Sequence, residues 1–327
     1  MSEKKQEMYV AERDKTQLKH KGRLPQTGVY LGKLFRMFIF QSDWKVFPMA
    51  AVIAGLVCYV VGDGLFRSME GTLLGTFAVS CICIWNGFFN SIQVICRERA
   101  IIKREHRSGM HITSYVLAHM IYQACLCLGQ TLVTLYVCIL MKVQFPVRSL
   151  ITGNVLVDIG ITVFLTTYAA DMMSLMVSAF VRSTTTAMTV MPFLLIFQLV
   201  FSGGFFSLTG TAEKLTNFTV AKWGLTALCS QGAYNELPMV SMWNSMTKLR
   251  NLEVEGQKPV QILIDMAEEQ EGGKEAVMLK CAEYNQNPNY DAVPEKVLLC
   301  WSRLILFILI FASLSVGSLE YVDKDKR

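Results

Sequence analysis

Charged residues are scarce in this chain, and two long stretches, residues 71–96 and 112–141, have none. Asp, Glu, Lys and Arg make up 17% of the 327 residues and hydrophobic residues 52%, whereas a soluble domain has about a quarter charged residues. Both stretches exceed the roughly 18 residues that indicate a membrane helix. The composition excludes an ordinary soluble domain and predicts an all-α polytopic membrane protein. Continuous apolar stretches also argue against a transmembrane β-barrel, whose strands are short and alternating.

The sequence also lacks the motifs of several enzyme classes. It has no G-x-x-x-x-G-K-[ST] phosphate loop: Gly272-Gly273-Lys274 has neither the upstream glycine nor the following hydroxyl. The ten cysteines show no metal-ligand spacing, so no metal site is expected. No nucleophile–base pair is recognisable within the apolar stretches, which disfavours a membrane enzyme. We therefore expect a chain that is not an enzyme and does not itself bind ATP.

Apolar stretches bounded by charge predict six membrane-spanning helices. An interfacial helix precedes them, because residues 28–44 mix large apolar side chains with Lys33 and Arg36. The expected spans are 46–62, 71–94, 114–141, 154–181, 184–206 and 297–319. The expected regions are a tail (1–27), the interfacial connecting helix (28–44), spans one to five (45–206), a re-entrant segment with an external loop (207–296), and span six with the C-terminus (297–327).

Basic residues alternate between the two sides of these spans. Residues 1–45 hold ten Lys and Arg, and the 97–110 link holds five. Because cytoplasmic loops carry the excess of basic residues, both termini and the 97–110 link are predicted to be cytoplasmic in a cell membrane. The net charge of +5 is thereby explained by orientation in a lipid bilayer rather than by nucleic-acid binding.

The 97–110 link is a charged, helix-capable segment held between two membrane-length stretches. Ala100, Ile101 and Ile102 form a short apolar patch among its charges, and Ser108-Gly109 is a helix stop signal. A short helix joined firmly to two spans at the cytoplasmic face is suited to receive force from a soluble partner. The alternative is an ordinary positively charged loop.

The order of these pieces resembles the membrane domain of type-two ABC exporters, the white and pleiotropic-drug-resistance class. In that family the link is the coupling helix, with a pattern E-x-x-x-[apolar]-x-R-E-x-x-x-G, an aromatic residue and then S-x-Y. Met110 replaces the aromatic residue here, and Thr113-Ser114-Tyr115 follows in place of S-x-Y. A second match is Phe201-Ser202-Gly203-Gly204-Phe205-Phe206 with the later Trp223 and Tyr234. The residues that match the coupling pattern are Glu98, Ile102, Arg104, Glu105 and Gly109.

The resemblance implies an exporter permease that alternates between inward- and outward-facing states. A separate ABC ATPase, or a missing part of a longer chain, would bind ATP and Mg²⁺, and a second permease copy would complete a homodimer. In the family, spans two and five line the path, with an apolar gate at the outer end. The residues at those depths are Cys83, Asn86, Asn90, Ile196 and Leu199 for the path and Gly204 and Phe205 for the gate. Packing between helices is the alternative role for the path residues.

Two further features remain open at this point. Asp171 falls near the middle of the fourth span, where a carboxylate is costly and must face protein or water. It predicts either a buried structural contact or, as an alternative function, a proton-coupled secondary transporter. Cys229 and Cys281 lie in the 207–296 segment and are candidates for a disulfide if that segment is outside the cell.

Overall fold

The described residues form a long bundle of helices. The computed structural model describes residues 22–40, 43–204, 206, 210–253, 257–269 and 273–321; of the predicted tail, residues 1–21 lie outside these ranges. Within them, all regular elements are α- or 3-10 helices and there is no strand. Five helices are long and apolar enough to cross a membrane, so the all-α membrane class is confirmed.

These five spans follow the predicted apolar stretches closely. They are α3 (Val46–Val61, preceded by a 3-10 turn at Asp43–Lys45), α4 (Met69–Ser91), which continues into α5 (Val94–Arg107), then α6 (Ile112–Leu140), α7 (Val155–Phe180) and α14 (Pro294–Glu320). The side chains of Ser68 and Asn154 accept hydrogen bonds from the backbone N–H groups of Gly71 and Leu156. These N-caps fix the starts of α4 and α7.

The predicted fifth span is shorter than expected. α8 (Thr184–Val200) has 17 residues and contains Pro192, whereas each of the five spans has at least 19 when the 3-10 turn before α3 is counted. The chain turns at Phe201–Gly204, where the Ser202 hydroxyl donates to the carbonyl of Leu199 and Gly203 has a φ of +79°. The end predicted at residue 206 is therefore wrong, because an apolar sequence continues past the turn that ends the helix. The described residues thus hold five candidate spans and one shorter apolar helix.

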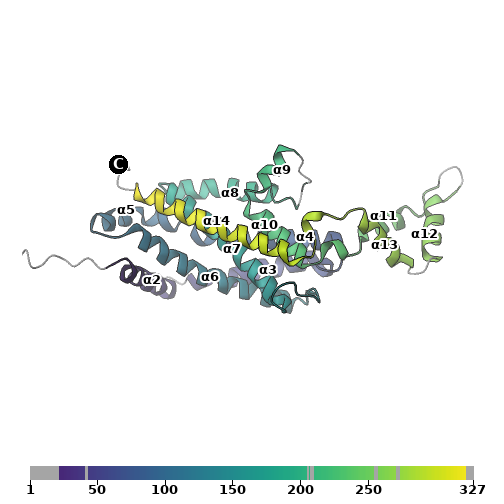
Figure 1. Cartoon of the computed structure of the whole chain (residues 1–327), viewed down its shortest axis with the longest axis horizontal. Helices are drawn as coiled ribbons and strands as arrows, with labels where there is room; N and C mark the ends of the chain where they lie inside the picture. The colour runs from purple at the N-terminus through teal and green to yellow at the C-terminus, as the bar shows by residue number, and fades with distance from the viewer. Residues whose placement is uncertain are drawn as a thin grey trace, which may run out of the picture.

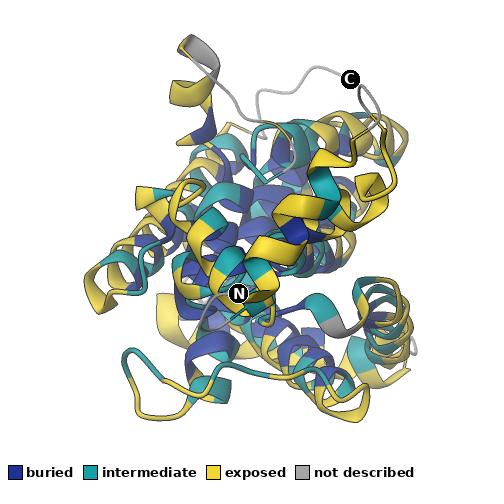
Figure 2. Cartoon of the chain, turned by 90° about the vertical axis from the view of Figure 1, so that its right-hand side faces the viewer, coloured by how far each residue is buried: buried dark blue, intermediate teal, exposed yellow. Residues whose placement is uncertain are grey.

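The centre of the bundle is α7, which packs against α4 on one side and α14 on the other. Gly87 lets α4 approach closely, since a Cβ built there would lie 2.5 Å from the carbonyl oxygen of Thr167. Trp301 of α14 donates to the hydroxyl of Thr162 at 2.8 Å. Figure 2 shows buried residues gathered between the helices and exposed residues on the outside. The exposed side chains include many large apolar ones, such as Val60, Phe193 and Leu309, as expected of a lipid-facing surface.

A further helix, α10 (Val220–Gln231), is buried among α4, α7 and α14. The side-chain carbonyl of Gln198 accepts from the N–H groups of Val220 and Ala221 at 2.9 and 3.2 Å, which caps its start. At its other end Gln231 donates to the carbonyl of Asp158 at 3.0 Å. The short α9 (Thr211–Thr216) precedes it. This buried helix extends the bundle core into the segment predicted to be re-entrant.

Three short helices project from one end of the bundle (Figure 1). They are α11 (Val240–Leu249), α12 (Pro259–Glu269) and α13 (Gly273–Glu283), around a small core of Trp243, Ile264 and Met278. The Glu70 carboxylate at the start of α4 accepts from the N–H groups of Val240 and Ser241. That cap fastens α11 to the bundle. The opposite end holds α2 (Arg23–Phe40), α5 and the end of α14.

Candidate functional site

The predicted coupling segment is the helix α5, which follows α4 after a break at Ile92 and Gln93. Ile95 and Ile102 are fully buried and pack in a core cluster with Met110 and Tyr115. The helix ends at Arg107 with Ser108 as its C-cap, and Gly109 takes a φ of +97°, which favours glycine. One face of α5 is therefore anchored in the bundle.

Hydrogen bonds join α5 to α7 at two places. The Ser178 hydroxyl accepts from the N–H groups of Ile95 and Cys96 at 3.0 and 3.1 Å. Arg99 donates through Nη1 to the carbonyls of Ala179 and Val181 at 2.7 and 3.2 Å. The first N–H groups and last carbonyls of a helix have no partner within it. Here the start of α5 and the end of α7 satisfy each other, so the two helices are held together at their junction.

Charged and aromatic side chains join α5 to α2. Lys33 of α2 lies 3.3 Å from Glu98, and Tyr115 of α6 donates to the same carboxylate at 3.3 Å. Tyr30 of α2 donates to Glu105 at 2.9 Å. Burial and the hydrogen bond to Glu105 both raise the pKa of Tyr30. Its hydroxyl therefore stays protonated and remains a donor throughout the physiological pH range.

The start of α6 is also tied to α2. Gln26 donates to the carbonyl of Gly109 at 3.3 Å and accepts from the N–H of His111 at 3.0 Å. Ser114 donates to the carbonyl of Arg23 at 2.9 Å. α2 thus bonds to both sides of the turn between α5 and α6. The sequence did not predict these contacts of α2, nor those of Ser178 and Arg99. Lys33 was the available signal, because a lysine in an apolar segment indicates a carboxylate partner.

The five predicted coupling residues have different surroundings. Glu98 and Ile102 are buried and make internal contacts, and Gly109 forms the turn. Glu105 is half-buried beside Tyr30, and Arg104 is exposed. Of these five, Arg104 is the residue whose side chain is most available to a soluble partner.

The predicted path residues of α4 do not share one surface. Cys83 and Asn86 are buried within the bundle. Asn90 is partly exposed and exchanges two hydrogen bonds with Gln130 of α6, at 2.9 and 3.1 Å. The exposed side of α4 in this region carries Trp85 and Phe89, whose rings lie 5.7 Å apart. In the single chain, Cys83 and Asn86 therefore pack between helices, which is the role that the sequence left open as the alternative to lining a path.

On α8, Ile196 is 59% exposed and Leu199 is partly buried against the core cluster that includes Phe88 and Leu195. Gly204 is half-buried, and a Cβ built there would lie 2.9 Å from Leu225 and from Phe77. Phe205 lies outside the described residues. Of the two predicted gate residues, the structure therefore describes only Gly204. Its backbone packs tightly against α4 and α10.

Cys229 and Cys281 are both free thiols in the structure. Cys229 is buried in α10, with its sulfur 3.1 Å from the hydroxyl of Thr76, whereas Cys281 lies partly buried in α13. The predicted disulfide is therefore not formed here. Across the described ranges, His, Cys, Asp and Glu side chains form no group of three placed to hold a metal ion.

The two acidic side chains of α7 have contrasting surroundings. Asp158 is buried and accepts hydrogen bonds from the Ser149 hydroxyl and from the N–H groups of Leu150, Ile151 and Thr152. Asp171 is fully buried; one oxygen lies 3.8 Å from the Cys127 sulfur, and the other receives no hydrogen bond from the described residues. Asp158 thus shapes a loop, whereas Asp171 is incompletely bonded.

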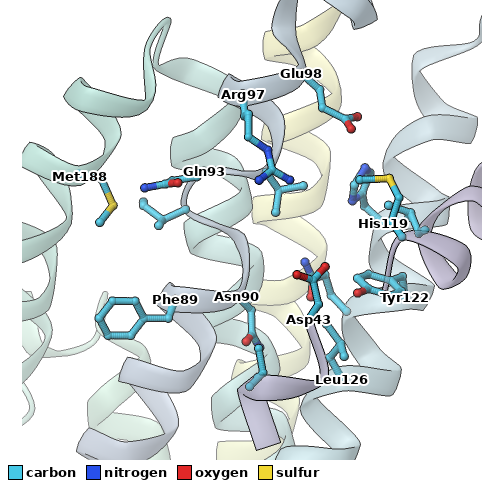
Figure 3. A pocket seen from close by; sticks show the side chains of 16 residues that line it. Asp43, Phe89, Asn90, Gln93, Arg97, Glu98, His119, Tyr122, Leu126 and Met188 are labelled. Atoms are coloured by element: carbon cyan, nitrogen blue, oxygen red, sulfur yellow. The ribbon is translucent and has the colours of Figure 1, made fainter. Parts of the chain in front are cut away.

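A cavity of about 330 Å³ opens between α2, the α4–α5 break and α6 (Figure 3). Its apolar lining includes Leu34, Phe89 and Leu126. Its polar lining consists of Asp43, Asn90, Gln93, Arg97, Glu98, His119, Tyr122 and Gln123. The cavity therefore lies beside the coupling segment, on the face of α4 that carries Asn90 and Phe89.

Comparison with known proteins places this arrangement in a family. The family model of the ABC-2 type transporter matches residues 35–223, a range that includes α5, α6 and α7 but only the end of α2. The chain is also 26% identical over 146 residues to an ABC transporter ATP-binding/permease protein of Mycobacterium tuberculosis. That match covers 44% of this chain and 17% of the relative, so the chain spans a small part of the relative's length. The chain is a multi-pass membrane protein that belongs to the ABC-2 type transporter family.

Proposed function

We propose that this chain is the permease of an ATP-driven exporter of the white and pleiotropic-drug-resistance class, with its termini and α5 in the cytoplasm. The observation that carries the proposal is the attachment of α5 to three other helices: to α7 through Ser178 and Arg99, and to α2 and α6 through Glu98 and Glu105. A force applied to α5 is thereby passed to spans on both sides of it. An ordinary loop would need none of these bonds.

The proposed force comes from a nucleotide-binding domain, in a separate polypeptide or in another part of a longer one. That domain would bind ATP and Mg²⁺ and press on the exposed side of α5 around Arg104. The M. tuberculosis relative is an ATP-binding/permease protein by name, which supports an ATPase partner for this chain too. A second copy of the permease would complete the path across the membrane. This chain would be a transport subunit with no catalytic residue.

Reversal of charge at Arg104 tests the proposal. Arg104→Glu is expected to abolish co-purification of the ATPase and ATP-dependent transport while leaving the fold intact, because Arg104 is exposed. The matched control is Arg148→Glu, a charge reversal at another exposed arginine, in the α6–α7 connection, which should leave both unchanged. A cysteine at Ser108, exposed at the end of α5, should form a cross-link with the ATPase. Full association and transport in Arg104→Glu would overturn the proposal.

A proton-coupled transporter that uses Asp171 is less well supported. The family match favours the ATP-driven class, and Asp171 is fully buried among α4, α6 and α7 rather than lining the cavity beside α5. Transport that continued without ATP and stopped when the proton gradient was collapsed would favour this alternative.

A further inference from the structure

The cavity beside α5 contains polar groups that lack partners in the chain. His119 and Gln123 lie one helical turn apart on α6, both are almost fully buried, and both line the cavity. Nδ1 of His119 and Oε1 of Gln123 have no hydrogen-bond partner among the described residues. Buried polar atoms are nearly always bonded, because an unpaired one costs free energy. The two atoms therefore point to a ligand that supplies their hydrogen bonds.

Charges of both signs also line the cavity. Figure 3 shows Arg97 of α5 extending into it from one side and the Asp43 carboxylate from the other. No ion pair joins either side chain to another described residue. Glu98 also lines the cavity, but its charge is offset by Lys33 at 3.3 Å. A lining with one unpaired cation and one unpaired anion matches a zwitterion better than an ion of either sign.

The apolar part of the lining indicates where such a ligand comes from. Phe89 and Met188 are exposed side chains that line the cavity from α4 and α8, and Leu34, Met37 and Leu126 add apolar walls. In the proposed orientation, the start of α5 lies at the headgroup level of the cytoplasmic leaflet. A cavity of about 330 Å³ falls within the range of small-ligand sites. Its mixed lining suits a headgroup with the first part of an acyl chain.

We propose that this cavity binds the headgroup of a zwitterionic phospholipid with a primary ammonium group, phosphatidylethanolamine. Arg97 donates to the phosphate, as guanidinium groups do in phosphate recognition. The ammonium group has three N–H donors, which match the Asp43 carboxylate, Oε1 of Gln123 and Nδ1 of a neutral His119. A quaternary choline group has no N–H to give. The inference rests on the proposed membrane orientation but not on the proposed ATPase.

Native mass spectrometry of the full chain tests the inference. The protein is purified in detergent with equal amounts of phosphatidylethanolamine, phosphatidylcholine and phosphatidylglycerol of the same acyl chains. One phosphatidylethanolamine per chain is expected to be retained, at least about tenfold above either other lipid, because the loss of a single charge-assisted hydrogen bond already produces that ratio. Soluble glycerophosphoethanolamine, which shares the headgroup, is expected not to displace it.

Two variants and a control separate recognition from folding. Arg97→Gln should reduce retention about tenfold, whereas Arg104→Gln, an exposed arginine of α5 that does not line the cavity, should not. Gln123→Leu removes a buried unpaired amide, so it should raise the thermal stability of the lipid-free protein and still reduce retention. Equal retention of the three lipids, unchanged retention in Arg97→Gln, or displacement by the soluble headgroup would overturn the inference. Cross-linking of the ATPase at Ser108→Cys would be unaffected by any of these results.

Discussion

A single hydroxyl, that of Ser178, holds the start of α5 against α7. It is buried and accepts two backbone N–H groups, so Ser178→Ala leaves both donors without a partner in the protein interior. The expected loss of stability is about 1–3 kcal/mol, the cost of buried unsatisfied groups. Thermal unfolding in detergent, followed by circular dichroism, measures it.

The control for this prediction is Ser302→Ala. Ser302 is exposed, and its hydroxyl bonds within its own helix to the carbonyl of Leu299. Ser302→Ala should change the free energy of unfolding by no more than about 0.5 kcal/mol, as at other surface positions. If the two variants unfolded at the same temperature, the hydroxyl of Ser178 would not be holding α5.

At this scale the sequence predicted residue types better than their partners. Glu98 and Glu105 were predicted as coupling residues from the family pattern, but their partners Lys33 and Tyr30 lie far away in the chain. Asp158 illustrates the same limit. Its carboxylate is bonded by the loop at 149–152, and that loop conformation is not encoded in any local spacing.

At the scale of helices, the close approach of α4 and α7 depends on Gly87. A Cβ built there would lie 2.5 Å from the carbonyl oxygen of Thr167 and 2.7 Å from the backbone nitrogen of Asp171. Neither backbone atom can move away without shifting α7. Gly87→Ala is therefore expected to destabilise the protein by about 1–3 kcal/mol, as overpacking does, measured by the shift of the thermal unfolding midpoint.

Gly55→Ala in α3 is the matched substitution. Its added Cβ would meet Val137 at 3.9 Å, an ordinary contact. Alanine is favoured over glycine in a helix interior by roughly 0.5–1 kcal/mol, so this variant should be as stable as the parent or more so. A Gly87→Ala protein of parental stability would show that the α4–α7 contact is looser than described.

Helix ends were predictable where a polar cap or a charge marks them. Ser68, Asn154 and Ser183 begin α4, α7 and α8, each by accepting a backbone hydrogen bond. The end of α8 was missed because residues 201–206 remain apolar while the chain turns at Gly203. Hydropathy reports which residues avoid water, but it does not report where a buried backbone turns.

At the scale of the whole molecule, the charge alternation predicted which segments share an end of the bundle, but it did not predict the interior contacts. α2, α5 and the end of α14 lie at one end and α11–α13 at the other, which fits the alternation of basic residues. The cavity beside α5 was not predicted. It is assembled from α2, α5 and α6 together, so no single segment carries its pattern.

The uncovered face of α8 leads to a last prediction, on the second permease copy. Ala187, Met191, Leu195 and Gln198 form its buried stripe, while Phe193 on the other face is 70% exposed. Pro192 has no N–H to donate to the carbonyl of Met188, and lipid offers that carbonyl no donor either. Such a face is better placed against a second copy than against acyl chains.

A cysteine at Phe193 should therefore cross-link two chains under mild oxidation, in a background where the exposed Cys125 is serine. A cysteine at Leu306, on the exposed side of α14, should leave the chains separate. Cross-linking at Leu306 with none at Phe193 would place the second copy on α14 instead.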